Sequence, residues 1–216
     1  MHDKQIKKVN SYYDELLNKH GENPGALGLP KGRQEIRFKN IDKLFFSGCS
    51  ILDYGCGLAD LNKYLKKRFS KEKFTYSGCD IMPKFLEISK KIYPDIDFFD
   101  LRNENIEKKF DIITAFGVFN FPYTKDEKKH FEIIKTKLKD IFSITNKYFL
   151  VDFQTEFVDY KQNNAYHQNI NSLANYIANN LSRRFEIIHS YLPYEYSVII
   201  YKENEINKND NTFLTK

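Results

Sequence analysis

The 216-residue chain is 41% hydrophobic and 29% charged, which is enough to build one domain with a substantial core. Its 34 basic residues exceed its 29 acidic residues, but lysines and acids alternate, which favours a solvated surface over a nucleic-acid footprint. The three cysteines form no C-x-x-C pair, so we expect no metal site. No apolar run approaches the ~18 residues of a membrane span and no signal-peptide core opens the sequence, so we expect a cytoplasmic protein.

Residues 1–46 predict a helical cap that precedes the sheet. Apolar residues recur at helical spacing over residues 3–20, and a loop rich in glycine and proline follows over 21–32. A second helix is predicted to begin at Gln34 and to carry Ile36, Ile41, Leu44 and Phe45. This region is not needed to build a sheet.

Residues 47–202 predict an α/β domain. Strands near 50–54, 74–80, 95–99, 110–116 and 145–152 are separated by helices near 58–68, 83–92 and 125–141, which indicates a doubly wound parallel sheet. Two further strands, 185–191 and 195–201, have too short a link for a crossover helix and must be antiparallel. Residues 203–216 are polar and predict a tail.

The turn after the first strand predicts a ligand site. Gly55 and Gly57 allow the backbone to approach a ligand closely, and a helix follows at once. A dinucleotide site requires a third glycine three residues later, where this chain has Asp60. That carboxylate, like Asp53 before the turn, disfavours a pyrophosphate and an NAD-dependent enzyme, and suits a cationic ligand with an ammonium group.

These residues resemble a known family. The segment Leu52-Asp53-Tyr54-Gly55-Cys56-Gly57 resembles motif I of the class I S-adenosylmethionine-dependent methyltransferases. Three later strand ends are similar to that family in the same order: 76–80, 98–101 and 110–117. The resemblance covers about residues 45–202 and implies a Rossmann-like seven-stranded sheet in the order 3-2-1-4-5-7-6. Tyr12-Tyr13 and Gln34-x-x-Arg37 also resemble the leader of a poorly characterised bacterial branch that acts on small molecules.

The resemblance implies how S-adenosylmethionine would be bound. Asp80 would accept hydrogen bonds from the ribose, or would only cap its strand. Asp100 would meet the adenine amino group, or would be a loop acid. Arg37 would pair with the cofactor carboxylate, or would form a surface ion pair. The remaining expected cofactor contacts are Gly55, Cys56 and Gly57 at the methionine part, Ile81, Met82 and Leu101 at the adenine, and Phe116 and Gly117 beneath the sulfonium.

The acceptor site is expected beyond the fourth and fifth strands. His167 is the candidate base because histidine titrates near neutrality, and Asp152 could orient it or act itself. We expect His130 on the surface and His189 in a structural position. The side chains expected to line the acceptor pocket are Tyr12, Tyr13, Asn120, Tyr123 and Tyr166.

The function predicted from the sequence is methylation of a small polar acceptor, most simply O-methylation of a sugar, a nucleotide-linked sugar or a phospho-metabolite. Residues 116–123 lack the Asp/Asn-Pro-Pro-Tyr/Phe motif of enzymes that methylate bases in nucleic acid. An RNA methyltransferase remains the first alternative because of the positive net charge. A non-catalytic cofactor-binding or scaffolding domain is the second.

Overall fold

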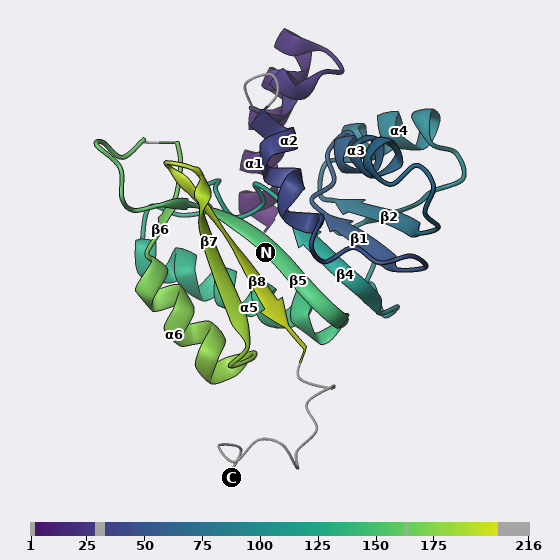
Figure 1. The fold of residues 1–216 in the computed structure, drawn as a ribbon. Coiled ribbons are helices and arrows are strands. Elements are labelled where there is room, and N and C mark those ends of the chain that lie inside the picture. The colour runs from purple at the N-terminus through teal and green to yellow at the C-terminus, as the bar shows by residue number, and fades with distance from the viewer. Residues whose placement is uncertain (1–2, 29–32, 163, 203–216) are drawn as a thin grey trace, which may run out of the picture.

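A single mixed β-sheet forms the centre of the described structure. The computed structural model describes residues 3–28, 33–162 and 164–202, and residues 29–32 of the predicted loop and the predicted tail lie outside this part (Figure 1). The main strand order is β3-β2-β1-β4-β5-β8-β7, and a short β6 pairs with β5. The strands are β1 Ser50–Tyr54, β2 Thr75–Asp80, β3 Asp97–Asp100, β4 Phe110–Ala115, β5 Thr145–Thr155, β6 His167–Gln168, β7 Phe185–Leu192 and β8 Glu195–Tyr201.

The predicted topology is confirmed. β1 pairs in parallel with β2 and β4, and β8 pairs antiparallel with both β5 and β7. Because β6 takes one number, this is the expected order 3-2-1-4-5-7-6 with one short strand added. β6 has only two residues, which is too short to give a periodic signal in the sequence. β5 extends to Thr155, beyond the predicted end at residue 152.

Helices cover both faces of the sheet because successive strand residues point to opposite sides. Ile51 packs with Leu61 and Leu65 of α3, whereas the next residue, Leu52, packs with Ile134 of α5. Figure 1 accordingly shows α3 and α4 on one side of the sheet and α5 and α6 on the other. The helices are α1 Asp3–His20, α2 Arg33–Phe38, α3 Asp60–Arg68, α4 Pro83–Ile92, α5 Glu127–Ser143 and α6 Ile170–Asn180.

The first helix docks across the end of the sheet. On one side, Tyr13 packs against Phe85 of α4 with 5.9 Å between ring centroids, and Asp14 pairs with Lys84 at 2.9 Å. On the other side, Lys8 Nζ donates to the Pro122 carbonyl at 3.5 Å. α1 therefore bridges the α4 layer and the loop that follows β4.

Two predicted features of the N-terminal region differ in the structure. The helix expected to continue past Ile41 ends at Phe38 and becomes a 3₁₀ turn, Lys39–Ile41. Within the predicted loop, residues Pro24–Leu27 form a second 3₁₀ turn that packs beneath α1. Among the described residues, no helix combines the length and the apolar character that a membrane crossing requires.

Candidate functional site

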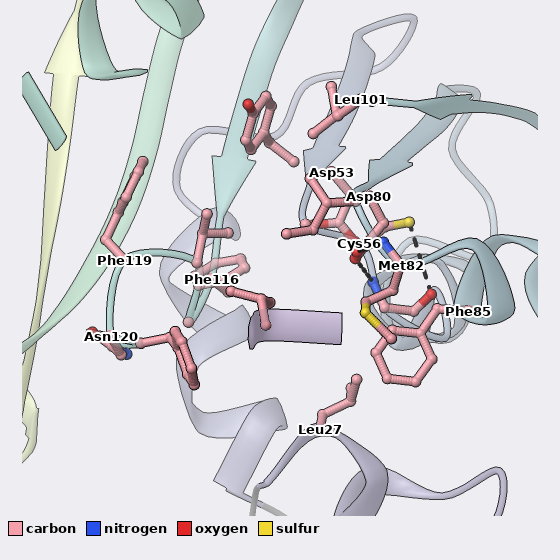
Figure 2. Close-up of a pocket in the computed structure, with 18 of the residues that line it drawn as sticks. Leu27, Asp53, Cys56, Asp80, Met82, Phe85, Leu101, Phe116, Phe119 and Asn120 are labelled. Carbon is pink, nitrogen blue, oxygen red and sulfur yellow. Dashed lines mark hydrogen bonds between the residues drawn. The ribbon is translucent and has the colours of Figure 1, made fainter. Parts of the chain in front are cut away.

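A cavity of about 700 Å³ opens at the carboxyl ends of the strands, between α1 and the sheet. This is the edge where open parallel sheets bind their ligands. In Figure 2, the Asp53, Asp80, Met82 and Phe85 side chains gather at one end of the pocket, and Phe116, Phe119 and Asn120 gather at the other. The cavity lining includes these residues that the sequence predicted: Tyr12, Tyr13, Arg37, Asp53, Gly55, Cys56, Gly57, Asp80, Ile81, Met82, Leu101, Phe116, Gly117, Asn120 and Tyr123.

The turn after β1 is held by the carboxylate that ends β2. The Gly57 amide donates to Asp80 Oδ2 at 2.9 Å, and the Met82 amide donates to Asp80 Oδ1 at 2.8 Å. Gly55 and Gly57 have φ angles of 79° and 52°, a region that side chains with a Cβ rarely adopt. Burial raises the pKa of Asp80, although the backbone amides of Gly57, Met82 and Ile81 oppose that rise. A carboxylate has about four lone-pair sites, so Asp80 keeps some capacity to accept a hydrogen bond from a ligand.

Two more carboxylates lie at this end of the cavity. Asp53 accepts hydrogen bonds from the Tyr76 hydroxyl at 2.7 Å and the Thr114 hydroxyl at 3.1 Å, and burial raises its pKa to about 7. Asp60 begins α3, and its Oδ2 is buried without a hydrogen-bond partner in the described structure. Burial also raises the pKa of Asp60. An unpartnered buried carboxylate oxygen is costly alone, so this end suits a bound cation.

Asp100 does not take the place predicted for it. Its carboxylate turns to Arg102, whose Nη2 lies 2.5 Å from Asp100 Oδ2, and this partner lowers the pKa of Asp100. Leu101 and Arg102 line the cavity, whereas Asp100 lies outside the lining. This geometry favours the alternative of a loop acid, and the contact of Asp100 with the adenine stays a prediction.

Arg37 is neither a surface ion pair nor free to clamp a ligand with its bidentate face. It is only 3% exposed. Its Nε and Nη2 donate to the two Glu195 oxygens at 2.6 and 2.7 Å, and its Nε lies 3.3 Å from Asp152 Oδ2. Arg33 also reaches Glu195 at 2.8 Å. The bidentate carboxylate expected from a cofactor is therefore supplied by β8 of the protein itself.

The two predicted catalytic residues lie outside the cavity lining. Asp152 Oδ1 accepts from the Gly117 amide at 2.5 Å, and Asp152 Oδ2 faces Arg37, so this carboxylate fixes the turn after β4. His167 lies on β6, where its Nδ1 is 2.8 Å from the Thr155 carbonyl. No contact between the two side chains is seen in the described structure, and their roles as base and orienting acid stay predictions.

Tyr166 and His130 were also misplaced by sequence reasoning. The Tyr166 ring packs against the His130 ring at a tilt of 44°, with 3.9 Å between centroids, and lies outside the cavity lining. His130 is fully buried rather than on the surface, its Nδ1 accepts from the Tyr123 amide at 3.2 Å, and burial lowers its pKa to about 4. His189 lies on β7 and contacts the Pro193 carbonyl, which agrees with its structural assignment.

The end of the cavity over β4 and β5 is walled by rings and amides. We call this region the β4–β5 end, and it comprises Tyr12, Asn120, Phe121, Tyr123, Gln154 and Gln162. Asn120 Oδ1 accepts a hydrogen bond from the backbone N–H of Gln154 at 2.9 Å. The side-chain oxygen of Gln154, Oε1, is buried without a hydrogen-bond partner in the described structure. Sequence reasoning missed Phe121 and Gln154, although both come just after the predicted end of a parallel strand.

Comparisons with known proteins agree with this fold. Residues 51–141 match the model of a family described as a methyltransferase domain, so the resemblance predicted from motif I is confirmed. Protein 235L of Invertebrate iridescent virus 6, which is named as a methyltransferase, is 30% identical over 110 residues. That match covers 49% of this chain, and the chain spans 40% of the viral protein's length.

Solved structures show the same architecture at low identity. The magnesium protoporphyrin IX methyltransferase of Synechocystis PCC 6803 with bound SAH has a TM-score of 0.62 at 13% identity, over 91% of this chain and 99% of that one. A chain of an RNA repair complex has a TM-score of 0.61 at 13% identity, over 94% of this chain and 48% of that one. At such identity, these likenesses establish the class I methyltransferase fold.

Proposed function

We propose that this chain, which carries a methyltransferase domain at residues 51–141, is an S-adenosylmethionine-dependent methyltransferase that acts on a small acceptor. The observation that carries the proposal is the cavity end formed by the Gly55–Gly57 turn, Asp80 and Asp60, whose Oδ2 has no hydrogen-bond partner although Gln34 and Lys63 act on the same carboxylate. This arrangement combines a close backbone approach with carboxylates and suits a ligand that joins an ammonium group to a ribose.

The cofactor contacts follow from this arrangement. Asp60 and Asp53 would attract the ammonium group, and the remaining lone pairs of Asp80 would accept from the ribose hydroxyls. Met82 and Phe85, with Leu101 opposite, supply an apolar slot for the adenine. The Nη1 atom of Arg37 is not used in the pair with Glu195 and could face the cofactor carboxylate. This atom lies beside Gly117, 3.6 Å from the position that a Cβ would take there.

The cofactor supplies an activated methyl group on a sulfonium, so the protein mainly has to hold the acceptor in line with it. Asp152 contributes indirectly by fixing the Gly117 amide at the start of the β4–β5 end. The aromatic side chains and the docked helix α1 line that end of the cavity.

The hydroxyl acceptors expected from the sequence receive less support than methyl transfer itself. A sugar hydroxyl is a weak nucleophile that needs a base. The two proposed bases, His167 and Asp152, lie outside the cavity lining. We therefore propose a small acceptor without restricting it to sugars, and keep O-methylation as one outcome of acceptor screening. We keep the cytoplasmic location expected from the sequence as part of this proposal.

The two alternatives predicted from the sequence are weaker on this geometry. The cofactor end of the cavity gathers carboxylates rather than the basic groups that track a nucleic-acid backbone. An open cavity of about 700 Å³ also lacks the occlusion that a non-catalytic scaffold would be expected to show.

Calorimetric titration with S-adenosylhomocysteine, with NAD and NADP in parallel, tests the cofactor. We expect S-adenosylhomocysteine alone to bind, and at least tenfold more weakly to Asp80→Asn. Asp100→Ala is the matched control, because Asp100 is an acid at the same edge of the sheet but does not line the cavity. Binding of NAD instead, or equal effects of the two substitutions, would overturn the proposed site.

A further inference from the structure

The two ends of the cavity differ in charge. The cofactor end holds Asp53, Asp60 and Asp80, whereas the described lining of the β4–β5 end carries neither a carboxylate nor a basic side chain. Cations lie near this end but outside its lining. Arg37 donates to both Glu195 oxygens, and the exposed Lys8 reaches the Pro122 carbonyl and lies 5.3 Å from the centre of the Phe121 ring. A phosphate or sugar nucleotide at the β4–β5 end would therefore find no counter-charge within the described lining itself.

The walls of the β4–β5 end are rich in aromatic rings. The Tyr12 and Phe121 rings lie 5.3 Å apart between centroids, and Tyr12 also packs edge-on against Tyr13 at 5.2 Å. Tyr123 adds a third ring, 6.2 Å from Phe121. Rings at such spacing favour stacked or edge-to-face contacts with another aromatic system. The β4–β5 end therefore fits a planar aromatic ligand better than a puckered polyhydroxyl ring.

One polar group in these walls has no partner. The backbone N–H of Gln154 donates to Asn120 Oδ1, and this bond fixes the orientation of the Asn120 side chain. Gln154 Oε1, by contrast, is buried without a hydrogen-bond partner in the described structure. Leaving a buried acceptor unsatisfied costs about 1–3 kcal/mol. A ligand that donates a hydrogen bond to Gln154 would remove this cost.

The β4–β5 end also offers no group that could take a proton at neutral pH. The Tyr123 hydroxyl donates to the Val118 carbonyl at 2.9 Å, and burial raises the pKa of Tyr123. His130 is buried behind Tyr123 and lies outside the lining. The acceptor atom must therefore be nucleophilic without help, as a nitrogen lone pair is.

We propose, given the methyltransferase function proposed above, that the acceptor is an uncharged planar heteroaromatic molecule that donates a hydrogen bond to Gln154 Oε1 and is methylated on a ring nitrogen. The nitrogen lone pair forms the new C–N bond while the C–S bond breaks, and the sulfur keeps that electron pair and becomes a neutral thioether. The nitrogen acquires the positive charge, and a ring N–H proton can then leave to water. No protein base is needed for this transfer.

Benzimidazole is a suitable probe because it is planar and uncharged and has both an N–H donor and a ring-nitrogen lone pair. We would titrate it into protein saturated with S-adenosylhomocysteine, and look for its N-methylated product by mass spectrometry with S-adenosylmethionine. Indole, which has the donor but lacks the basic lone pair, should bind without being methylated. UDP-glucose and glucose 6-phosphate represent the charged acceptors.

Gln154→Leu should weaken benzimidazole binding by about tenfold and leave S-adenosylhomocysteine binding unchanged, because a hydrogen-bonding site discriminates strongly once its polar partner is lost. Gln168→Leu is the matched control, since Gln168 also has a buried, unpartnered Oε1 but lies outside the cavity. Failure of benzimidazole to bind at millimolar concentration, equal losses in both variants, or methylation of UDP-glucose would each overturn the proposal. Failure of S-adenosylhomocysteine to bind would instead overturn the underlying function.

Discussion

The buried ion pairs between α2 and β8 should make a large contribution to stability through the single residue Arg37. Arg37→Met keeps much of the side-chain length but removes both hydrogen bonds to Glu195 and the contact with Asp152. Those carboxylates are 2% and 1% exposed, so both would remain buried, with Arg33 as the remaining partner of Glu195. Removing one partner of a buried pair typically costs about 3–5 kcal/mol, and we expect a loss in that range.

The assay is urea unfolding followed by circular dichroism at pH 7.5, where the free energy of unfolding is extrapolated to water. Lys43→Met is the matched control, because Lys43 pairs with Glu186 at 2.6 Å while both side chains are more than 40% exposed. An exposed pair of this kind contributes about 0–1 kcal/mol. If Arg37→Met cost no more than Lys43→Met, the reasoning that the buried pair holds α2 against the sheet would be refuted.

Two further predictions concern pH and the glycine turn. Burial raises the pKa of Asp53 from 3.8 to about 7, so the folded state holds this proton more tightly than the unfolded state does. The free energy of unfolding should therefore fall as pH rises across that interval, and Asp53→Asn should remove this pH dependence. The pH dependence from His130 has the opposite sign, because burial lowers its pKa from 6.5 to about 4. Its contribution to the free energy of unfolding is lost as pH falls across that interval. His130→Gln should reduce this pH dependence, measured by urea unfolding at a series of pH values. Gly55→Ala would place a Cβ 2.5 Å from Val118 Cγ2 at a φ of 79°, so we expect a loss of both thermal stability and S-adenosylhomocysteine affinity. Adding Val118→Ala should relieve the contact but not the backbone strain, and full recovery in the double variant would contradict this explanation.

The sheet was predictable because its signals are local. Ile51 and Leu52 lie on opposite faces of β1, and the glycines that follow mark the turn before α3. The same local reasoning could have placed His130, which shares a helix face with Ile134, Leu138 and Ile141, all of them buried. The surrounding lysines suggested a surface position, but the spacing of the apolar residues was the stronger signal.

Long-range pairing decides two of the contacts around the site and a local loop decides a third, and none of the three could be predicted from the sequence. Arg37 finds its partner 158 residues away on β8, and no spacing in the sequence indicates this contact. His167 lies outside the cavity lining because it belongs to a two-residue strand that pairs with β5. Such a pairing cannot be predicted from a single sequence. Asp100 is turned away by Arg102, two residues later, through a loop geometry that composition does not specify.

The position of β8 also sets an order of assembly during synthesis. β8 is the last strand of the sheet in the chain, yet it lies between β5 and β7 and carries Glu195. While the ribosome adds residues at about 5–20 per second, the N-terminal strands can pair before β8 exists, but Arg37 has no bidentate partner until Glu195 emerges. The helix α2 should therefore stay loosely attached on the nascent chain until β8 has been made.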